Sequence, residues 1–232
     1  MAISPAQLSD LRKREATEAS KRGAKTGSQL CIYKTISGIE VEIYTDQGLE
    51  GDGKLKIAGI ERAVKMIADK GFALPSLRFI LTGAGGVENV AFMGNSSGNR
   101  AAVVYLGPKI GMQNKKNVTQ GVSDAVYDGT QRFFGNPKQT AMVTTVVIHE
   151  LGHVLHELMA EDQFWTNHEP ATMTSALVWG MAASKVSQYA RKMPLEFVAE
   201  AFSGIMVGKR YDQEVKIAYR ALGGPEVPGF FT

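Results

Sequence analysis

The segment His149-Glu150-Leu151-Gly152-His153 constrains this chain more than any other part of its sequence. It lies in an apolar, helix-compatible run, and residues i and i+4 of an α-helix differ by about 40° in azimuth and ~6 Å along the axis. Two imidazoles at that separation can bind one ion at Zn–N distances of ~2.0–2.1 Å. Glu150 can then take the proton of a water at an open position of the ion. The motif predicts a zinc site on a helix.

A catalytic zinc site of this kind needs a third protein ligand. Glu196 and Glu200 are i and i+4 in an otherwise apolar helix that Pro194 can begin. Buried carboxylates need partners, which a metal and its imidazole ligands would supply. We expect Glu196 to bind zinc and Glu200 to accept a hydrogen bond from the far ring nitrogen of a ligand histidine. The alternative is a solvated acidic edge of a C-terminal helix.

Three further residues are candidates for the site. His156 lies ~10.5 Å along the helix axis from His149, which favours a packing histidine or a neighbour of the site over a ligand. His168 and Glu169 fall in an expected loop and stay open as ligands, and His168 also as an oxyanion donor. The metzincin pattern HExxHxxGxxH fails, because His156 and Met159 stand at its glycine and last histidine positions.

The composition suits a soluble globular protein. Of 232 residues, 44% are hydrophobic and 21% charged, which is enough for a sizeable core in one domain. The single Cys31 excludes a disulfide framework and a cysteine-rich zinc site. We expect no membrane span, since no apolar run reaches ~20 residues, and we find no secretory signal peptide. The protein is therefore expected to be cytoplasmic, or secreted or injected without such a signal.

The net charge of +3 is unevenly distributed along the chain. Residues 1–30 hold six basic and three acidic side chains, which leaves 20 basic against 20 acidic in the rest. No basic face is visible outside the N-terminal segment, so we expect no nucleic-acid partner. We divide the chain into a polar basic segment, residues 1–28, and one domain, residues 29–232.

The periodicity of the domain predicts an α+β fold, with a mixed β-sheet in the N-terminal lobe, the motif helix after Gln139 and a helical C-terminal lobe. Asp46–Gly53 is expected to be an exposed turn, and Gly94–Gly98 a hairpin turn. The expected elements before Gln139 are strands at Cys31–Thr35 and Ile39–Tyr44 joined at Ser37-Gly38, a helix at Ile57–Lys70 stopped by Gly71, and strands at Leu77–Leu81, Val90–Met93 and Ala101–Leu106.

Both motifs together resemble the zinc peptidase domain of the anthrax lethal factor family, within the gluzincins. That family has a HExFGH-like helix and a later EFxAEAF-type helix, which Glu196–Phe202 matches here. Its first Glu is the third zinc ligand, its second is an outer-shell residue, and a Tyr seven residues before the ligand Glu stabilises the oxyanion. Tyr189 takes that position, and Glu196 stands 43 positions after His153, a gap similar to the family's. The resemblance covers about residues 140–205.

The resemblance implies a zincin-like fold and a zinc endopeptidase acting on a protein or peptide. It also implies that Ala101–Leu106 is the edge strand that pairs with an extended substrate. It further suggests a bacterial toxin or effector, with an immunity protein as a partner in the producing cell. His156 departs from the family's motif, and the substrate's identity does not follow from the matched residues.

Two other classes of protein stay open. One is a non-catalytic binding module stabilised by a closed zinc site, in which His156 or His168 would be a fourth protein ligand. The other is a structural protein of a phage or secretion particle. A metal centre without bound water would favour the first, and self-assembly would favour the second.

Overall fold

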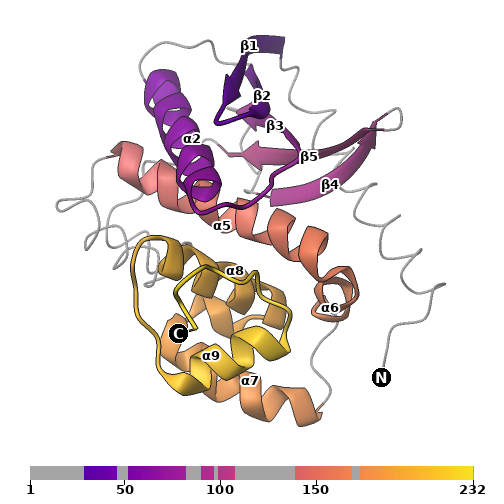
Figure 1. Ribbon diagram of the computed structural model, residues 1–232, viewed down its shortest axis with the longest axis vertical. Coiled ribbons are helices and arrows are strands. Elements are labelled where there is room, and N and C mark those ends of the chain that lie inside the picture. Colours follow the sequence, from indigo (N-terminus) through magenta and orange to yellow (C-terminus); the bar gives the residue numbers. More distant parts are fainter. Residues whose placement is uncertain are drawn as a thin grey trace.

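A five-stranded mixed sheet forms one layer of the protein (Figure 1). The computed structural model describes residues 29–45, 52–81, 90–96, 99–107, 139–168 and 173–231. The N-terminal segment 1–28 and Glu169 lie outside these ranges. The sheet and the helices described below confirm the mixed α+β class.

The predicted hairpin is confirmed. Strands β1 (Gln29–Ile36) and β2 (Ile39–Thr45) pair in antiparallel register, with Ile36 opposite Ile39. Ser37 and Gly38 form the turn with φ angles of 50° and 84°. Two positive φ angles in a two-residue turn match the right-handed twist of the strands that it joins.

The predicted helix is also confirmed, but it begins earlier than expected. Helix α2 (Asp52–Asp69) ends before Gly71, whose φ of 86° is the left-handed conformation that stops a helix. Asp52 and Gly53 belong to the first turn of α2. The expected exposed turn Asp46–Gly53 was therefore wrong for its last two residues. The apolar spacing that predicts a helix begins only at Ile57, which hides the first turn from a periodicity argument.

The sheet has the strand order β1-β2-β3-β5-β4, where β3 is Ser76–Leu81, β4 is Val90–Ser96 and β5 is Asn99–Leu106. The expectation that Ala101–Leu106 forms the edge of the sheet was wrong. Strand β5 pairs in parallel with β3 and antiparallel with β4, so β4 lies at the edge. Residues 102–107 are all buried, as in a strand covered on both faces. Strands β4 and β5 also extend further than expected, because Ser96 pairs with Asn99.

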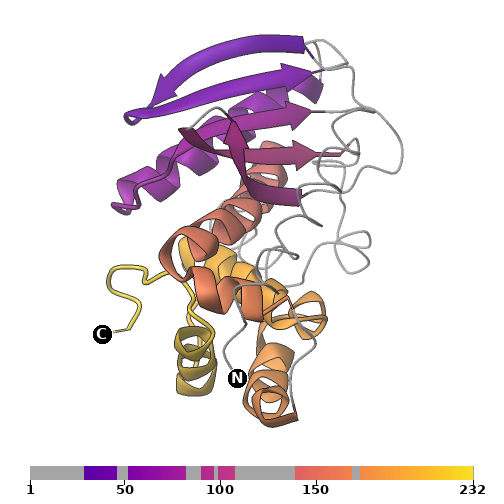
Figure 2. The ribbon, with the colours of Figure 1, turned by 90° about the vertical axis from the view of Figure 1, so that its right-hand side faces the viewer.

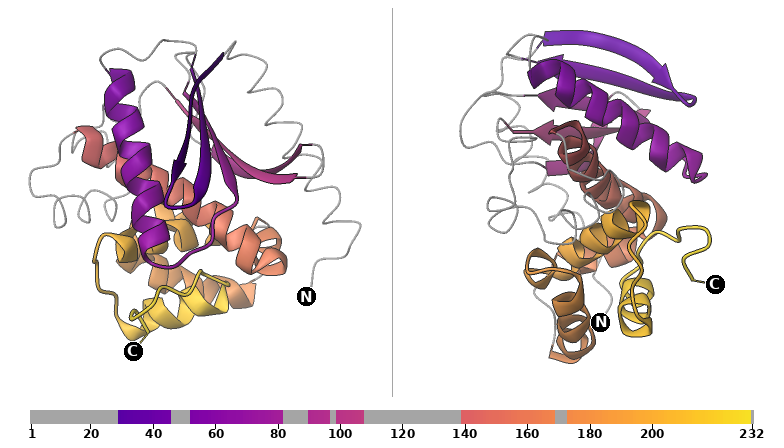
Figure 3. Two further views of the ribbon diagram at one scale, coloured as in Figure 1. Left: turned by 45° about the horizontal axis from the view of Figure 1, so that its top comes forward. Right: turned by 90° about the vertical axis from the view of Figure 1, so that its left-hand side faces the viewer.

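Helix α5 (Gln139–Met159) runs between the sheet and the helical lobe, as the two perpendicular views show (Figure 2). It packs on α2 on one side and on α8 on the other (Figure 3). None of the helices in the described ranges combines the length and apolar character needed to cross a bilayer. The helical lobe consists of α6 (Glu161–Thr166), α7 (Met173–Val186), the 3₁₀ helix η1 (Tyr189–Arg191), α8 (Pro194–Met206) and α9 (Gln213–Ala221).

One continuous apolar core joins the two lobes through α5. The sheet contributes alternate residues, such as Val41, Leu77 and Ala102, which lie side by side in register. The motif helix contributes Val147 and Leu151, which are fully buried. This packing holds the polar residues of α5 in a fixed orientation toward α8.

Candidate metal centre

His149 and His153 lie on one face of α5 and are both buried. Their ring centroids are 4.9 Å apart, and the rings meet edge to face. The neighbours Ile148, Leu151 and Val154 are buried in the core, so the helix cannot rotate without exposing apolar surface. The two imidazoles are therefore held toward the same point in space.

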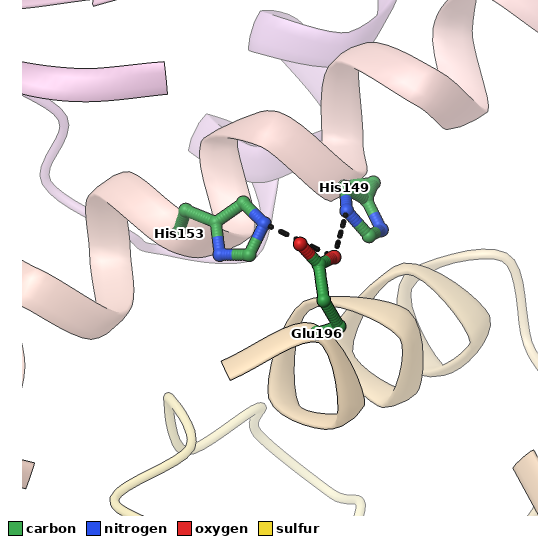
Figure 4. Close-up of side chains that lie close together, drawn as sticks. All are labelled: His149, His153 and Glu196. Atoms are coloured by element: carbon green, nitrogen blue, oxygen red, sulfur yellow. Dashed lines mark ion pairs between the residues drawn. The ribbon is translucent and has the colours of Figure 1, made fainter. Parts of the chain in front are cut away.

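Helix α8 brings Glu196 to that point (Figure 4). The helix begins at Pro194, and the extended Met193 before it places Glu196 in the first turn. Oε2 of Glu196 lies 3.2 Å from Nε2 of His149 and 3.6 Å from Nε2 of His153. A solvated acidic edge is not what the structure shows, because the Glu196 side chain is only 16% exposed.

Gly152 allows the two helices to approach this closely. A Cβ atom at Gly152 would lie 3.0 Å from Cδ1 of Phe202 and 3.5 Å from Cα of Ala199. Both neighbours belong to α8, where Ala199 lies three residues and Phe202 six residues after Glu196. The absence of a side chain at Gly152 thus sets the distance at which a carboxylate from α8 reaches the histidines.

The three side chains fit a metal ion. Their nearest ligand atoms all lie within 4.8 Å of one another, and among the described residues no other group of three or more His, Cys, Asp or Glu side chains does so. Ligand atoms ~2.0–2.1 Å from one tetrahedral ion are about 3.4 Å apart, which lies between the two N–O distances. Oε2 of Glu196 is also buried without a hydrogen-bond partner in the described part of the chain. A cation bound by all three residues would satisfy that oxygen.

A second carboxylate lies behind His149. Oε1 of Glu200 is 2.8 Å from Nδ1 of His149, and the Glu200 side chain is 1% exposed. The opposite oxygen, Oε2, accepts a hydrogen bond of 3.0 Å from the hydroxyl of Ser187. A carboxylate at this distance favours a proton on Nδ1 in a metal-bound His149, which would leave Nε2 as the ligand atom.

The charges of the site favour a cation between the helices. Burial works against protonation of His149, but the carboxylates of Glu196 and Glu200 outweigh it and raise its pKa well above the ordinary value. Burial likewise works against ionisation of Glu196, yet the two imidazoles outweigh it and lower its pKa. The buried carboxylates therefore draw positive charge to this place, and a bound metal ion would supply that charge instead of the proton on His149.

Glu150 is buried beside the cluster on the same helix. Burial raises the pKa of its carboxyl group, while the charges of His149 and His153 act in the opposite direction. A carboxylate with a raised pKa is a better proton acceptor than one in water. This environment suits a general base.

Tyr189 lies next to the cluster, at the start of η1. Its ring centroid is 6.1 Å from that of His149, and Nζ of Lys192 lies 4.2 Å above the ring. The structure thus brings together five of the residues that the sequence predicts for the site, with Glu200 behind them. The five are His149, Glu150, His153, Tyr189 and Glu196.

His156 takes the packing position that the helix geometry favours. Its Nε2 lies 2.8 Å from the backbone oxygen of Leu222, and its ring meets Phe164 edge to face. Asn167 donates to the same oxygen at 2.9 Å. Burial lowers the pKa of His156 to about 3, so the ring is neutral near pH 7. His156 is not among the residues whose ligand atoms converge.

His168 does not join the cluster either. Its ring stacks on Trp165 with centroids 5.1 Å apart, and its Nδ1 lies 3.1 Å from the backbone oxygen of Phe164. His168 therefore contacts residues of α6 and is not positioned as a ligand or an oxyanion donor of the cluster. Glu169, the other loop candidate, lies outside the described residues.

Sequence reasoning missed Ser187, which contacts Glu200. The usable signal is its place three residues before Ala190, because a serine hydroxyl often caps a helical turn that begins after it. Its contact with Glu200, 13 residues further on, has no periodic signature.

Comparison of the chain with protein-family models, with curated proteins and with solved structures finds no match. The assignment of the site therefore depends on its own geometry and chemistry.

Proposed function

We propose that this protein is a zinc-dependent endopeptidase with a zincin-like fold. The observation that carries the proposal is the convergence of Glu196, from a separate helix, on the Nε2 atoms of His149 and His153. Two histidines and a glutamate leave one position of a tetrahedral zinc open for water or substrate. Zinc fits this donor set of two imidazoles and a carboxylate, whereas Mg²⁺ and Ca²⁺ prefer oxygen ligands alone.

Zinc at this site would supply the Lewis acidity that polarises a peptide carbonyl and activates water. Glu150 would accept the proton of the attacking water at its buried carboxylate and pass it to the nitrogen of the leaving amine. Tyr189 would donate a hydrogen bond to the oxyanion that forms at the carbonyl. Glu200 would keep His149 in the tautomer that binds through Nε2.

The sheet offers a place for an extended peptide. β4 is the edge strand, and it lies beside α5. A peptide that added a strand to this edge would run near the motif helix. We therefore assign to β4 the substrate-pairing role first expected of Ala101–Leu106.

A closed zinc site in a binding module is the weaker candidate. It requires a fourth protein ligand, and both nominated residues, His156 and His168, make other contacts. Among the described residues, no fourth ligand joins the three. A particle-structural role has no observation in its favour, and sizing of the purified protein would detect self-assembly.

Replacement of Glu150 by Gln tests catalysis directly. We expect Glu150→Gln to keep its zinc and to lose about 10²–10⁴-fold in the rate of peptide hydrolysis, because the amide cannot accept a proton. The measurement is proteomic cleavage profiling with wild type and variant, with zinc content determined on the same samples. Glu157→Gln, a carboxylate later on α5, is the matched control and should cleave like the wild type. Equal cleavage by Glu150→Gln and wild type would refute the mechanism.

The biological role that we propose is that of a bacterial toxin or effector, which follows from the family resemblance alone. Expression of the wild type in a bacterial cytoplasm, a bacterial periplasm and a eukaryotic cell should harm at least one of them, while Glu150→Gln should not. An immunity protein from the producing cell would suppress that effect. Harmless expression of fully metallated wild type in all three places would contradict the role.

A further inference from the structure

Ser187 lies between the end of α7 and the start of η1, and its side chain is directed toward Glu200, the carboxylate behind His149. The residue is 5% exposed, and its hydroxyl makes two hydrogen bonds. It donates to Oε2 of Glu200 at 3.0 Å and accepts from the backbone nitrogen of Ala190 at 2.9 Å. The hydroxyl group is thus used both as a donor and as an acceptor.

The first bond reaches His149 through one carboxylate. Ser187 and His149 contact opposite oxygens of Glu200, at 3.0 Å and 2.8 Å. Two contacts on opposite oxygens fix the plane of a carboxylate, whereas one leaves it free to rotate. Without the hydroxyl, a buried acceptor would also lose its partner, which is costly in a low-dielectric interior. Ser187 therefore holds the group that orients a metal ligand.

The second bond holds the turn that carries Tyr189. A serine hydroxyl that accepts from the amide three residues later fixes the first turn of a helix. Ala190, whose amide donates, directly follows Tyr189, and the Tyr189 ring lies 6.1 Å from the ring of His149. The same hydroxyl thus connects the outer carboxylate of the site with the backbone of the tyrosine.

We propose that Ser187 is a positioning residue of the metal centre, whose hydroxyl sets the orientation of His149 through Glu200 and the place of Tyr189 through Ala190. The inference rests on the proposed zinc site. It adds to that site the hydrogen bond from Ser187 to Glu200. Loss of an outer-shell partner costs about 10–100-fold in metal affinity, and Ser187 acts one bond further out. We therefore expect about a tenfold loss of zinc affinity when the hydroxyl is removed.

Two variants test this with the full chain. Ser187→Ala removes the hydroxyl, and Ser187→Cys keeps a similar volume but has only a weak donor. Both should bind zinc about tenfold more weakly in competition with a chromophoric chelator. Both should also change the visible spectrum of the Co²⁺-substituted protein, which reports on ligand geometry. Ser203→Ala, a buried serine on α8 whose hydroxyl donates to the backbone oxygen of Thr145, is the matched control and should change neither.

A double-mutant cycle shows whether Ser187 acts through Glu200. In a Glu200→Leu background the acceptor is gone, so Ser187→Ala should weaken zinc binding by less than twofold. A full tenfold loss in that background would overturn the proposed route.

The outcomes separate this inference from the proposed function. If the wild type binds zinc and both Ser187 variants bind it with the same affinity and cobalt spectrum, the positioning role is refuted and the zinc site stands. If the wild type binds no zinc, both proposals are refuted.

Discussion

Two neighbouring turns of α5 carry buried histidines, and they differ in what other elements bring to them. The first turn, with His149 and His153, meets the carboxylate of Glu196 from α8. The next turn, with His156, meets the backbone oxygen of Leu222. A carboxylate draws a positive charge to the first turn, whereas a carbonyl only accepts the N–H of a neutral ring. Burial of a histidine does not by itself suggest a metal site, whereas convergence with an anionic side chain from another helix forms a group that could hold a metal ion.

The largest effect should follow from removal of that anionic group. Glu196→Ala takes away a proposed direct ligand, so we expect it to lower zinc affinity more than the 10–100-fold typical of an outer-shell loss, on the order of 1000-fold. The measurement is zinc content after dialysis against a weak chelator, with a thermal melt to show that the variant is folded. A folded Glu196→Ala protein that keeps a full equivalent of zinc would remove the distinction between the two turns.

A comparison of the two histidine positions sharpens the contrast within one helix. His153→Gln should lose tightly bound zinc, whereas His156→Gln should keep a full equivalent, because only the first residue faces Glu196. Isothermal titration of both variants with Zn²⁺ gives the affinities. Equal losses in the two variants would mean that His156 takes part in binding.

The smallest effect is a pH dependence of folding that belongs to the second turn. Burial lowers the pKa of His156 from 6.5 to about 3, so between these values the unfolded chain binds more protons than the native protein. The contribution of neutral His156 to the free energy of unfolding is therefore fully present above about pH 6.5, and it is lost as the pH is lowered toward 3. At pH 5 the loss from this residue is about 2 kcal/mol.

Urea denaturation of the wild type and His156→Gln at pH 7 and pH 5 isolates this contribution. The glutamine can still donate to Leu222 but does not titrate, so the variant should lose about 2 kcal/mol less than the wild type over this interval. The same loss in both proteins would show that His156 is not held neutral in the native state.

Local patterns predicted the elements well and their assembly less well. Ser37-Gly38 and Gly71 stand where positive φ angles are required, which made the hairpin and the end of α2 predictable. The prediction of the edge strand was wrong because the order of strands in a sheet depends on pairing between segments that are distant in the sequence. The unbroken apolar run Ala101–Leu106 did carry a clue, since such runs are typical of strands buried on both faces.

The site followed from helical spacing wherever its residues recur on one face. His149 and His153, and then Glu196 and Glu200, are each four residues apart, so the sequence alone pairs them. Ser187 has no such spacing, because its partner lies across the junction of η1 and α8. Nor does the sequence show that Gly152 is where Phe202 packs, a contact that only the structure reveals.

The most direct test of the metal centre is a crystal structure of the zinc-loaded protein with anomalous diffraction recorded at the zinc edge. We predict one anomalous peak between α5 and α8, with Nε2 of His149, Nε2 of His153 and a carboxylate oxygen of Glu196 at ~2.0–2.2 Å and one ligand from solvent. A peak elsewhere, or a fourth protein ligand in place of solvent, would contradict the account.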